Sequence, residues 1–299
     1  MYETSDKFNS ILTKYAQGAY LNPGDEIDLT RIFFPTLGVE EAHGEFDIWK
    51  SKSALTAVDT SMARDNTPRR LQLDRTVGVF NCTPHGLEIA RSAFNDMQKS
   101  GPRYQEAALR TLMSAQFASR QTATVAAVKA AKAAENSLGA WTSNSTADVI
   151  GQIEQLCHNV VSGTGCKPTD ILIGRTAWSK LRNHPTIVNR INGISYAMPE
   201  EAFLTLLAYK GVKLTVVDSM TMVNGAMTEL LANDVIALYN QEAPTVSDMS
   251  FAKEFTLSPS GPEVLSYEEH GGVNKVDMLL WSSDCKVTNA NAMSRLVVS

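Results

Sequence analysis

The chain of 299 residues is long enough to bury a large core, and its 43% hydrophobic and 20% charged residues are typical of a globular protein. Its net charge of −5 does not favour general binding of duplex DNA through a basic surface. Its four cysteines are scattered along the chain, which indicates a reducing compartment instead of a disulfide framework. The sequence shows neither a secretion signal at its N-terminus nor an apolar run long enough to span a bilayer, so cytosolic synthesis is expected.

The first 50 residues combine one predicted helix with predicted extended chain. The apolar pattern over 8–20 predicts an amphipathic helix, and residues 22–24 predict a turn after it. Residues 27–50 are rich in apolar and β-branched side chains, and Pro35 fixes a bend, so they predict extended chain. Such a segment has little core of its own and is expected to lie across another part of the molecule or across a neighbour.

A long polar insertion occupies residues 51–75. Segments with strand patterns flank it at 45–49 and 76–83, which predicts a two-stranded excursion with a polar tip. So long an excursion is hard to explain in an isolated compact domain, but it makes sense if it packs against another chain.

Charge changes sign along this part of the chain. Residues 24–50 carry seven acids and two bases, whereas residues 61–75 carry four arginines and two acids. A basic segment of one subunit can therefore meet an acidic segment of the next, although solvated surfaces explain the charges equally well. The candidate intersubunit contacts are Arg64, Arg69, Arg70, Arg75, Asp25, Glu26 and Asp28.

Residues 103–135 carry the clearest helix pattern. Alanine dominates, Gly and Pro are absent, and Pro102 stands at the expected start. An unbroken helix of this length measures about 50 Å, which suits a spine. Its apolar stripe is predicted to run through Leu109, Leu112, Ala115, Val125 and Val128. The heptads are not sustained, so a coiled coil is not favoured.

Residues 142–245 alternate helix and strand patterns, which predicts a mixed α/β unit. Helices are expected near 146–161, 175–194 and 199–210, and strands at 170–173, 212–217 and 229–239. Trp178 lies at a helical apolar position beside Ala177 and Leu181, so it is predicted to be a core anchor whose removal costs roughly 3–5 kcal/mol. Residues 249–281 are predicted to be extended chain with turns.

Candidate chemistry along the chain is weak. Residues 162–167 lack the spacing of a phosphate-binding loop, and no serine lies in the context of a nucleophile elbow. Cys157, His158 and Cys166 have no second pair at metal-ligand spacing. No catalytic residue, cofactor site or metal site is therefore predicted.

The order of these segments resembles that of HK97-type major capsid proteins of tailed bacteriophages along nearly the whole chain. In that family an extended chain leads into a long hairpin called the E-loop, and this passage resembles RIFFPTLGVEEAHGEFDIW here. The return strand of the hairpin, which in the family precedes a polar turn and a helix, resembles VGVFNCTPHGLEIA. Residues 103–135 resemble the family's spine helix. The strand–helix unit of its axial domain resembles ILIGRTAWSKLRNHPTIVNRI. The late strands of the family's peripheral domain resemble APTVSDMSFAKEF and VDMLLWSSDCKV.

The resemblance implies an α+β, HK97-like capsid fold. Its parts are expected to be an N-terminal arm (1–42), an E-loop (43–80), a peripheral domain with the spine helix (81–141), an axial domain (142–245), peripheral return strands (246–281) and a C-terminal strand (282–299).

The resemblance also implies a structural protein and not an enzyme. Such a protein self-assembles into pentameric and hexameric capsomers of an icosahedral phage head, which encloses double-stranded DNA without sequence-specific binding. The implied location is the virion, after synthesis in the host cytoplasm, and no membrane is involved. Further implied partners are a portal protein and, as options, scaffolding or decoration proteins. Two alternatives stay open: the shell of an encapsulin-type nanocompartment, and a soluble α/β enzyme.

Overall fold

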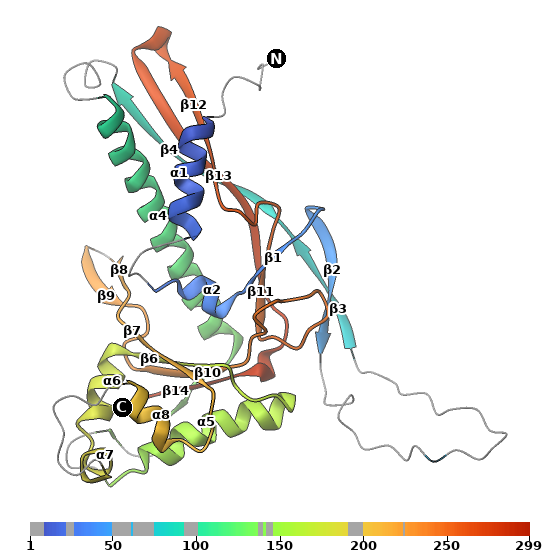
Figure 1. Ribbon diagram of the computed structural model, residues 1–299, viewed down its shortest axis with the longest axis vertical. Coiled ribbons are helices and arrows are strands. Elements are labelled where there is room, and N and C mark those ends of the chain that lie inside the picture. The colour runs from blue at the N-terminus through green and yellow to red at the C-terminus, as the bar shows by residue number, and fades with distance from the viewer. Residues whose placement is uncertain are drawn as a thin grey trace.

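The computed structural model describes residues 9–21, 27–49, 61, 75–92, 101–136, 140–141, 146–190, 200–223 and 225–299. Helices and strands alternate along these residues, and their strands form two five-stranded and two two-stranded sheets. Figure 1 shows one five-stranded sheet in the upper half of the molecule beside the long helix α4, and the other in the lower half among shorter helices.

The upper sheet is named here the peripheral sheet. It has the order β1–β11–β13–β12, and β4 also pairs with β13. Its strands are β1 (Thr36–Gly38), β4 (Thr83–Ser92), β11 (Ala252–Thr256), β12 (Glu263–Glu269) and β13 (Asn274–Val287). The sheet is organised around β13, because this long strand pairs antiparallel with β4, β11 and β12.

The spine helix α4 (Gly101–Ala131) confirms the prediction for residues 103–135, although it starts two residues earlier and ends four earlier. Its apolar stripe is buried as predicted at Leu109, Leu112, Val125 and Val128, whereas Ala115 is exposed. Helix α1 (Ser10–Leu21), which confirms the helix predicted at 8–20, packs with Leu12 and Ala16 against this stripe and the peripheral sheet.

The lower sheet, named the axial sheet, has the order β5–β14–β10–β6–β7. Its strands are β5 (Glu135–Asn136), β6 (Asp170–Gly174), β7 (Lys213–Val217), β10 (Asp234–Leu238) and β14 (Met293–Val297). Every residue of the central strand β10 is buried, which fits its apolar run. The last segment of the chain contributes to both sheets, because β13 ends in the peripheral sheet and β14 pairs with β10 in the axial sheet.

Four helices accompany the axial sheet: α5 (Val149–Thr164), α6 (Arg175–Arg182), α7 (Pro185–Arg190) and α8 (Glu200–Leu206). Helix α5 begins after Asp148, whose side chain accepts a hydrogen bond from the backbone N–H of Gly151, and ends at the left-handed Gly165. The strand predicted at 170–173 is confirmed as β6, and the helix predicted near 175–194 is present as the two short helices α6 and α7, the second of which begins at Pro185. Gly174 is required at the turn between β6 and α6, because a Cβ there would lie 1.5 Å from the carbonyl oxygen of Leu231.

Three local predictions are wrong. Residues 29–33 form the helix α2 (Leu29–Phe33) instead of extended chain, because the carboxylate of Asp28 caps the backbone N–H groups of Thr30 and Arg31. The return strand is followed by another strand, β4, and not by a helix, because β13 pairs with it along its whole length. The strand predicted at 229–239 is split between β10 and a separate hairpin of β8 (Met220–Val223) and β9 (Ala226–Glu229).

The largest core cluster lies under the axial sheet. Trp141 is completely buried in it and donates from Nε1 to the side-chain oxygen of Gln152 at 3.0 Å. Trp178 packs only at the edge of this cluster, edge-on to Phe203 with 5.8 Å between the ring centres, and stays partly exposed. The fully buried tryptophan of this core is therefore Trp141, which the sequence analysis did not single out, and the role of Trp178 as a core anchor stays a prediction.

Candidate assembly surfaces

The strands that flank the polar insertion form a separate two-stranded sheet, a ribbon that lies at one side of the molecule (Figure 1). Strands β2 (His43–Trp49) and β3 (Arg75–Asn81) pair antiparallel from His43 with Asn81 to Trp49 with Arg75. The prediction of strands at both ends of the insertion is confirmed, whereas residues 50–60 and 62–74, which contain its polar tip, lie outside the described residues.

The inner face of the ribbon is fixed to the peripheral sheet by aromatic packing. The ring of Phe80 stacks on Phe255 with 4.3 Å between centres, and Phe46 packs on the same ring at 5.4 Å. Gly44 and Gly78 make this possible, because a Cβ at either position would lie 2.4 to 2.5 Å from one of these phenyl rings. The start of the ribbon is therefore positioned by the core of its own subunit.

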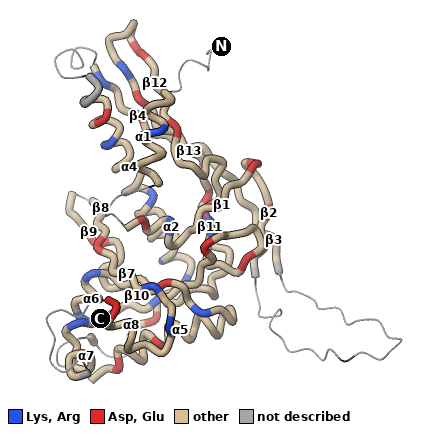
Figure 2. The backbone as a smooth tube through the Cα atoms, in the orientation of Figure 1, with Lys and Arg blue, Asp and Glu red and all other residues tan. Residues whose placement is uncertain are grey.

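The outer face of the ribbon is apolar and acidic. The side chains of Val77 and Val79 are 56% and 64% exposed. Their cross-strand partners are Asp47 and Glu45, and directly paired residues share one face of an antiparallel ribbon. Figure 2 shows acidic residues at this ribbon. Exposed apolar surface of this kind is typical of a protein contact.

The structure describes only some of the residues that are predicted to contact a neighbouring subunit. Arg64, Arg69, Arg70, Asp25 and Glu26 lie outside the described residues, and Arg75 is the first residue of β3. Asp28 caps α2 and pairs with Arg31 at 3.4 Å inside the subunit. Their roles between subunits stay predictions.

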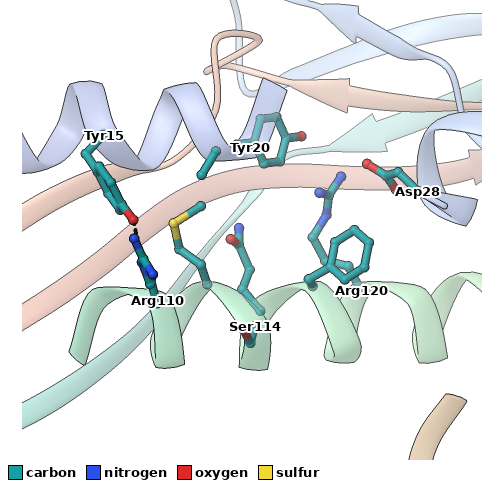
Figure 3. A pocket seen from close by; sticks show the side chains of 10 residues that line it. Tyr15, Tyr20, Asp28, Arg110, Ser114 and Arg120 are labelled. Atoms are coloured by element: carbon teal, nitrogen blue, oxygen red, sulfur yellow. Dashed lines mark hydrogen bonds between the residues drawn. The ribbon is translucent and has the colours of Figure 1, made fainter. Parts of the chain in front are cut away.

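A cavity of about 250 Å³ separates α1 from the spine helix (Figure 3). At one end the guanidinium of Arg110 donates to the hydroxyl of Tyr15 at 2.7 Å. At the other end two guanidinium groups lie over the ring of Tyr20, that of Arg31 at 4.8 Å and that of Arg120 at 5.0 Å from its centre. The N-terminal helix is thus held against the spine of its own subunit by cation–π contacts as well as by apolar packing.

Arg120 also connects the spine helix to the peripheral sheet. It donates to the carboxylate of Glu254 at 2.8 Å; the Glu254 side chain is buried and that of Arg120 is largely so. Burial by itself lowers the pKa of Arg120, but the nearby Glu254, Tyr20 and Asp28 together outweigh it and raise the pKa above its ordinary value. Burial raises the pKa of Tyr20, so this phenol stays neutral.

The adjacent residues Cys157 and His158, which the sequence offers as possible metal ligands, lie in different environments. Cys157 is buried whereas the adjacent His158 is exposed, and burial raises the pKa of the Cys157 thiol to about 12. A thiol with so high a pKa is a poor nucleophile. In the described part of the chain, no group of three or more His, Cys, Asp or Glu side chains is placed to hold a metal ion. Among the same residues, no helix combines the length and the apolarity needed to cross a membrane.

The sequence analysis missed one exposed feature, the β8–β9 hairpin. Met220, Met222 and Met227 are 43%, 69% and 65% exposed on it. A signal was present, since apolar residues alternate on both sides of Asn224-Gly225, and this dipeptide favours a tight hairpin turn. Gly225 has the positive φ of 81° that such a turn requires.

Comparisons with known proteins agree with this architecture. Residues 128–254 match the family model described as phage major capsid protein E. A phage-related protein from Bordetella bronchiseptica RB50 is 14% identical, with a TM-score of 0.72 over 97% of both chains. A virus-like particle from Pyrococcus furiosus is 11% identical, with a TM-score of 0.56 over 96% of this chain and 97% of the other.

The capsid of Myoviridae phage XM1 is also 11% identical, with a TM-score of 0.53 over 91% of this chain and 92% of the other. A search of curated proteins finds no matching relative. Identities this low establish the fold alone, and the family match is a similarity of residues 128–254 to phage major capsid proteins. The chain therefore has the HK97-type capsid fold.

Proposed function

We propose that this protein forms the pentameric and hexameric capsomers of an icosahedral phage head that encloses double-stranded DNA. The proposal is based on the two faces of the ribbon β2–β3. Its inner face is anchored on Phe255, while its outer face exposes Val77 and Val79 away from both large sheets. The subunit's own core covers only the inner face, so a neighbouring subunit is the natural cover for the exposed valines of the outer face.

The mechanism is geometric. The spine helix, the peripheral sheet and the axial sheet form a firmly packed subunit body, and the ribbon projects from it (Figure 1). Subunits that lap one another through such projections bury apolar surface at each contact, and complementary charges select the correct register. We assign the polar tip of the insertion, with Arg69 and Arg70, to such a contact.

The proposal extends to location and partners. The shell belongs to the virion after synthesis in the host cytoplasm, and a portal protein occupies part of it, with scaffolding or decoration proteins as further partners. DNA is enclosed without sequence-specific binding. The net charge of −5 supports this, because an acidic protein attracts phosphate backbones only weakly.

Negative-stain electron microscopy and sedimentation of the purified chain test the assembly. We expect capsomers or closed shells, and a stable monomer under all salt and pH conditions contradicts the proposal. Particles from the producing cell then distinguish a phage head from a nanocompartment. Double-stranded DNA protected from nuclease supports a head, whereas a protein cargo without DNA supports the encapsulin-type alternative.

A further inference from the structure

Strand β11 turns one face towards the spine helix and the other towards the ribbon. Glu254 meets Arg120 of the spine helix. Its neighbours Lys253 and Phe255 share the opposite face, because side chains alternate along a strand. On that face Phe255 stacks on Phe80 of the ribbon. Lys253 therefore lies on the face of the peripheral sheet that supports the ribbon.

The side chain of Lys253 is completely buried, which is rare for a lysine. Its ammonium pairs with the carboxylate of Asp248 and lies 3.4 Å from the backbone carbonyl oxygens of Val246 and Asp248. These partners belong to one loop, residues 239–251, which connects β10 of the axial sheet to β11. A buried charge is costly without such partners, so the contact holds the loop against β11.

The loop also has a defined shape of its own. The carboxylate of Asp248 accepts hydrogen bonds from the backbone N–H groups of Thr245 at 3.0 Å and Ser250 at 3.4 Å. The hydroxyl of Ser250 in turn accepts from the backbone N–H of Gln241 at 2.9 Å. Asp248 thus shapes the loop, while the buried ammonium fixes it to the sheet.

The carbonyl of Val246 also contacts the ribbon. The backbone N–H of Asp47, in the middle of β2, donates to this oxygen at 3.4 Å. One carbonyl oxygen therefore lies between the ammonium of Lys253 and the first strand of the ribbon.

The second strand of the ribbon is held by the same face of the sheet. The backbone N–H of Asn81, at the end of β3, donates to the carboxylate of Asp284 at 2.8 Å. Asp284 pairs directly with Phe255, so the two side chains share one face. Apolar ring contacts alone have no preferred direction, whereas hydrogen bonds do. The polar contacts therefore restrict how the ribbon can tilt on Phe255.

We infer that Lys253 is a positioning residue for the ribbon. Through the loop it fixes β2 and so sets the direction in which the ribbon leaves its own subunit. The consequence for assembly rests on the proposed function, whereas the contact itself belongs to the single subunit. Apolar side chains in place of a buried ion pair are often neutral or stabilising, so the pair is better suited to specifying a geometry than to adding stability.

Hydrogen–deuterium exchange of the unassembled subunit tests the contact. Lys253→Met keeps an unbranched side chain but removes the ammonium. We expect the Asp47 amide to exchange roughly two- to tenfold faster, the range that corresponds to the loss of one hydrogen bond. Electron microscopy of the same variant should show open or irregular particles in place of closed shells.

A double variant separates positioning from stability. Lys253→Met alone leaves the carboxylate of Asp248 without a counter-charge, which lowers stability whatever the role of the lysine. Adding Asp248→Asn removes the unpaired charge and keeps an oxygen that can accept from Thr245. The urea midpoint should then return to that of the wild type, whereas fast exchange at Asp47 and irregular particles should persist.

Lys286→Met is the matched control. Lys286 pairs directly with Lys253 across the sheet, but its side chain is 41% exposed and contacts Asp284 instead of the loop. The exchange of the Asp47 amide and the closed shells should both match those of the wild type.

Each outcome of the double variant is decisive. Wild-type exchange at Asp47 overturns the inference, and so do normal shells together with fast exchange. A urea midpoint that stays low also overturns it, because Lys253 then serves the stability of the subunit body. If the wild-type chain does not assemble, the proposed function fails, while the exchange at Asp47 still decides whether Lys253 holds the ribbon.

Discussion

Arg120 on the spine helix and Glu254 on β11 form a buried ion pair in which Nη2 donates to both carboxylate oxygens at 2.8 Å. Their side chains are 11% and 2% exposed. Because the ring of Tyr20 packs on the same guanidinium, this contact joins the N-terminal helix, the spine and the peripheral sheet. Its loss should therefore weaken three parts of the subunit at once.

We predict that Arg120→Met lowers the free energy of unfolding by about 3–5 kcal/mol, because it leaves the buried carboxylate of Glu254 without a counter-charge. Urea denaturation of the unassembled subunit measures the change. Adding Glu254→Met should restore much of the stability, since no unpaired charge then remains. Lys286→Met is the control: its side chain is 41% exposed beside Asp284, so a loss below about 1 kcal/mol is expected. Equal losses for Arg120→Met and Lys286→Met would contradict the prediction.

The two tryptophans of the axial core should differ in their contributions. Trp141→Ala is expected to cost roughly 3–5 kcal/mol, because it empties a fully buried aromatic site. Trp178→Ala should cost less, about 2 kcal/mol, since its ring keeps contact with water at the edge of the cluster. Denaturant midpoints of both variants decide the order. A larger loss at position 178 would show that the edge-on contact with Phe203 dominates this core.

His184 should make stability depend on pH. It is fully buried, its Nδ1 accepts from the backbone N–H of Thr186 at 3.3 Å, and burial lowers its pKa below 6.5. The unfolded chain, with an ordinary pKa, binds the proton at higher pH than the folded chain does. The free energy of unfolding therefore falls as pH drops through about 6.5, and it keeps falling until the lowered folded pKa is reached.

His184→Asn keeps an acceptor for Thr186 but removes this titration. Urea denaturation between about pH 7.5 and pH 5 should show that the advantage of the wild type over the variant shrinks towards acid. Parallel stability curves for the two proteins would exclude His184 as the cause of any acid sensitivity.

Arg69→Glu combined with Arg70→Glu is expected to impair assembly and leave the subunit folded. Both arginines follow Pro68 in the polar insertion, far in sequence from any apolar cluster, so their reversal should set like charges together only where the tip meets an acidic neighbour. Circular dichroism reports folding, and sedimentation reports assembly.

A charge exchange provides the control for this variant. If the acidic segment at 24–47 is the partner, Asp25→Lys with Glu26→Lys should restore part of the assembly in the same chain. Normal shells from the double arginine variant would argue against an electrostatic contact of the tip, and loss of the folded signal would place these arginines in the subunit's own core.

Local sequence determined much of the secondary structure. The alanine-rich run without Gly or Pro specifies the spine helix, because helix propensity and an apolar stripe act together over many turns. Gly174 and Pro185 mark the turns between β6, α6 and α7. The strand patterns around the polar insertion define the ribbon, since alternation over short segments predicts extended chain.

Only the tertiary structure decided which segments meet. Residues 83–92 are extended because β13 supplies a partner along their whole length, and residues 29–33 are helical because Asp28 caps them and Phe33 is buried. Periodicity identifies an apolar face but not the surface that covers it, so it cannot rank Trp141 above Trp178. The same limit explains why the pair of Arg120 with Glu254 was not foreseen, because it joins residues far apart in the chain.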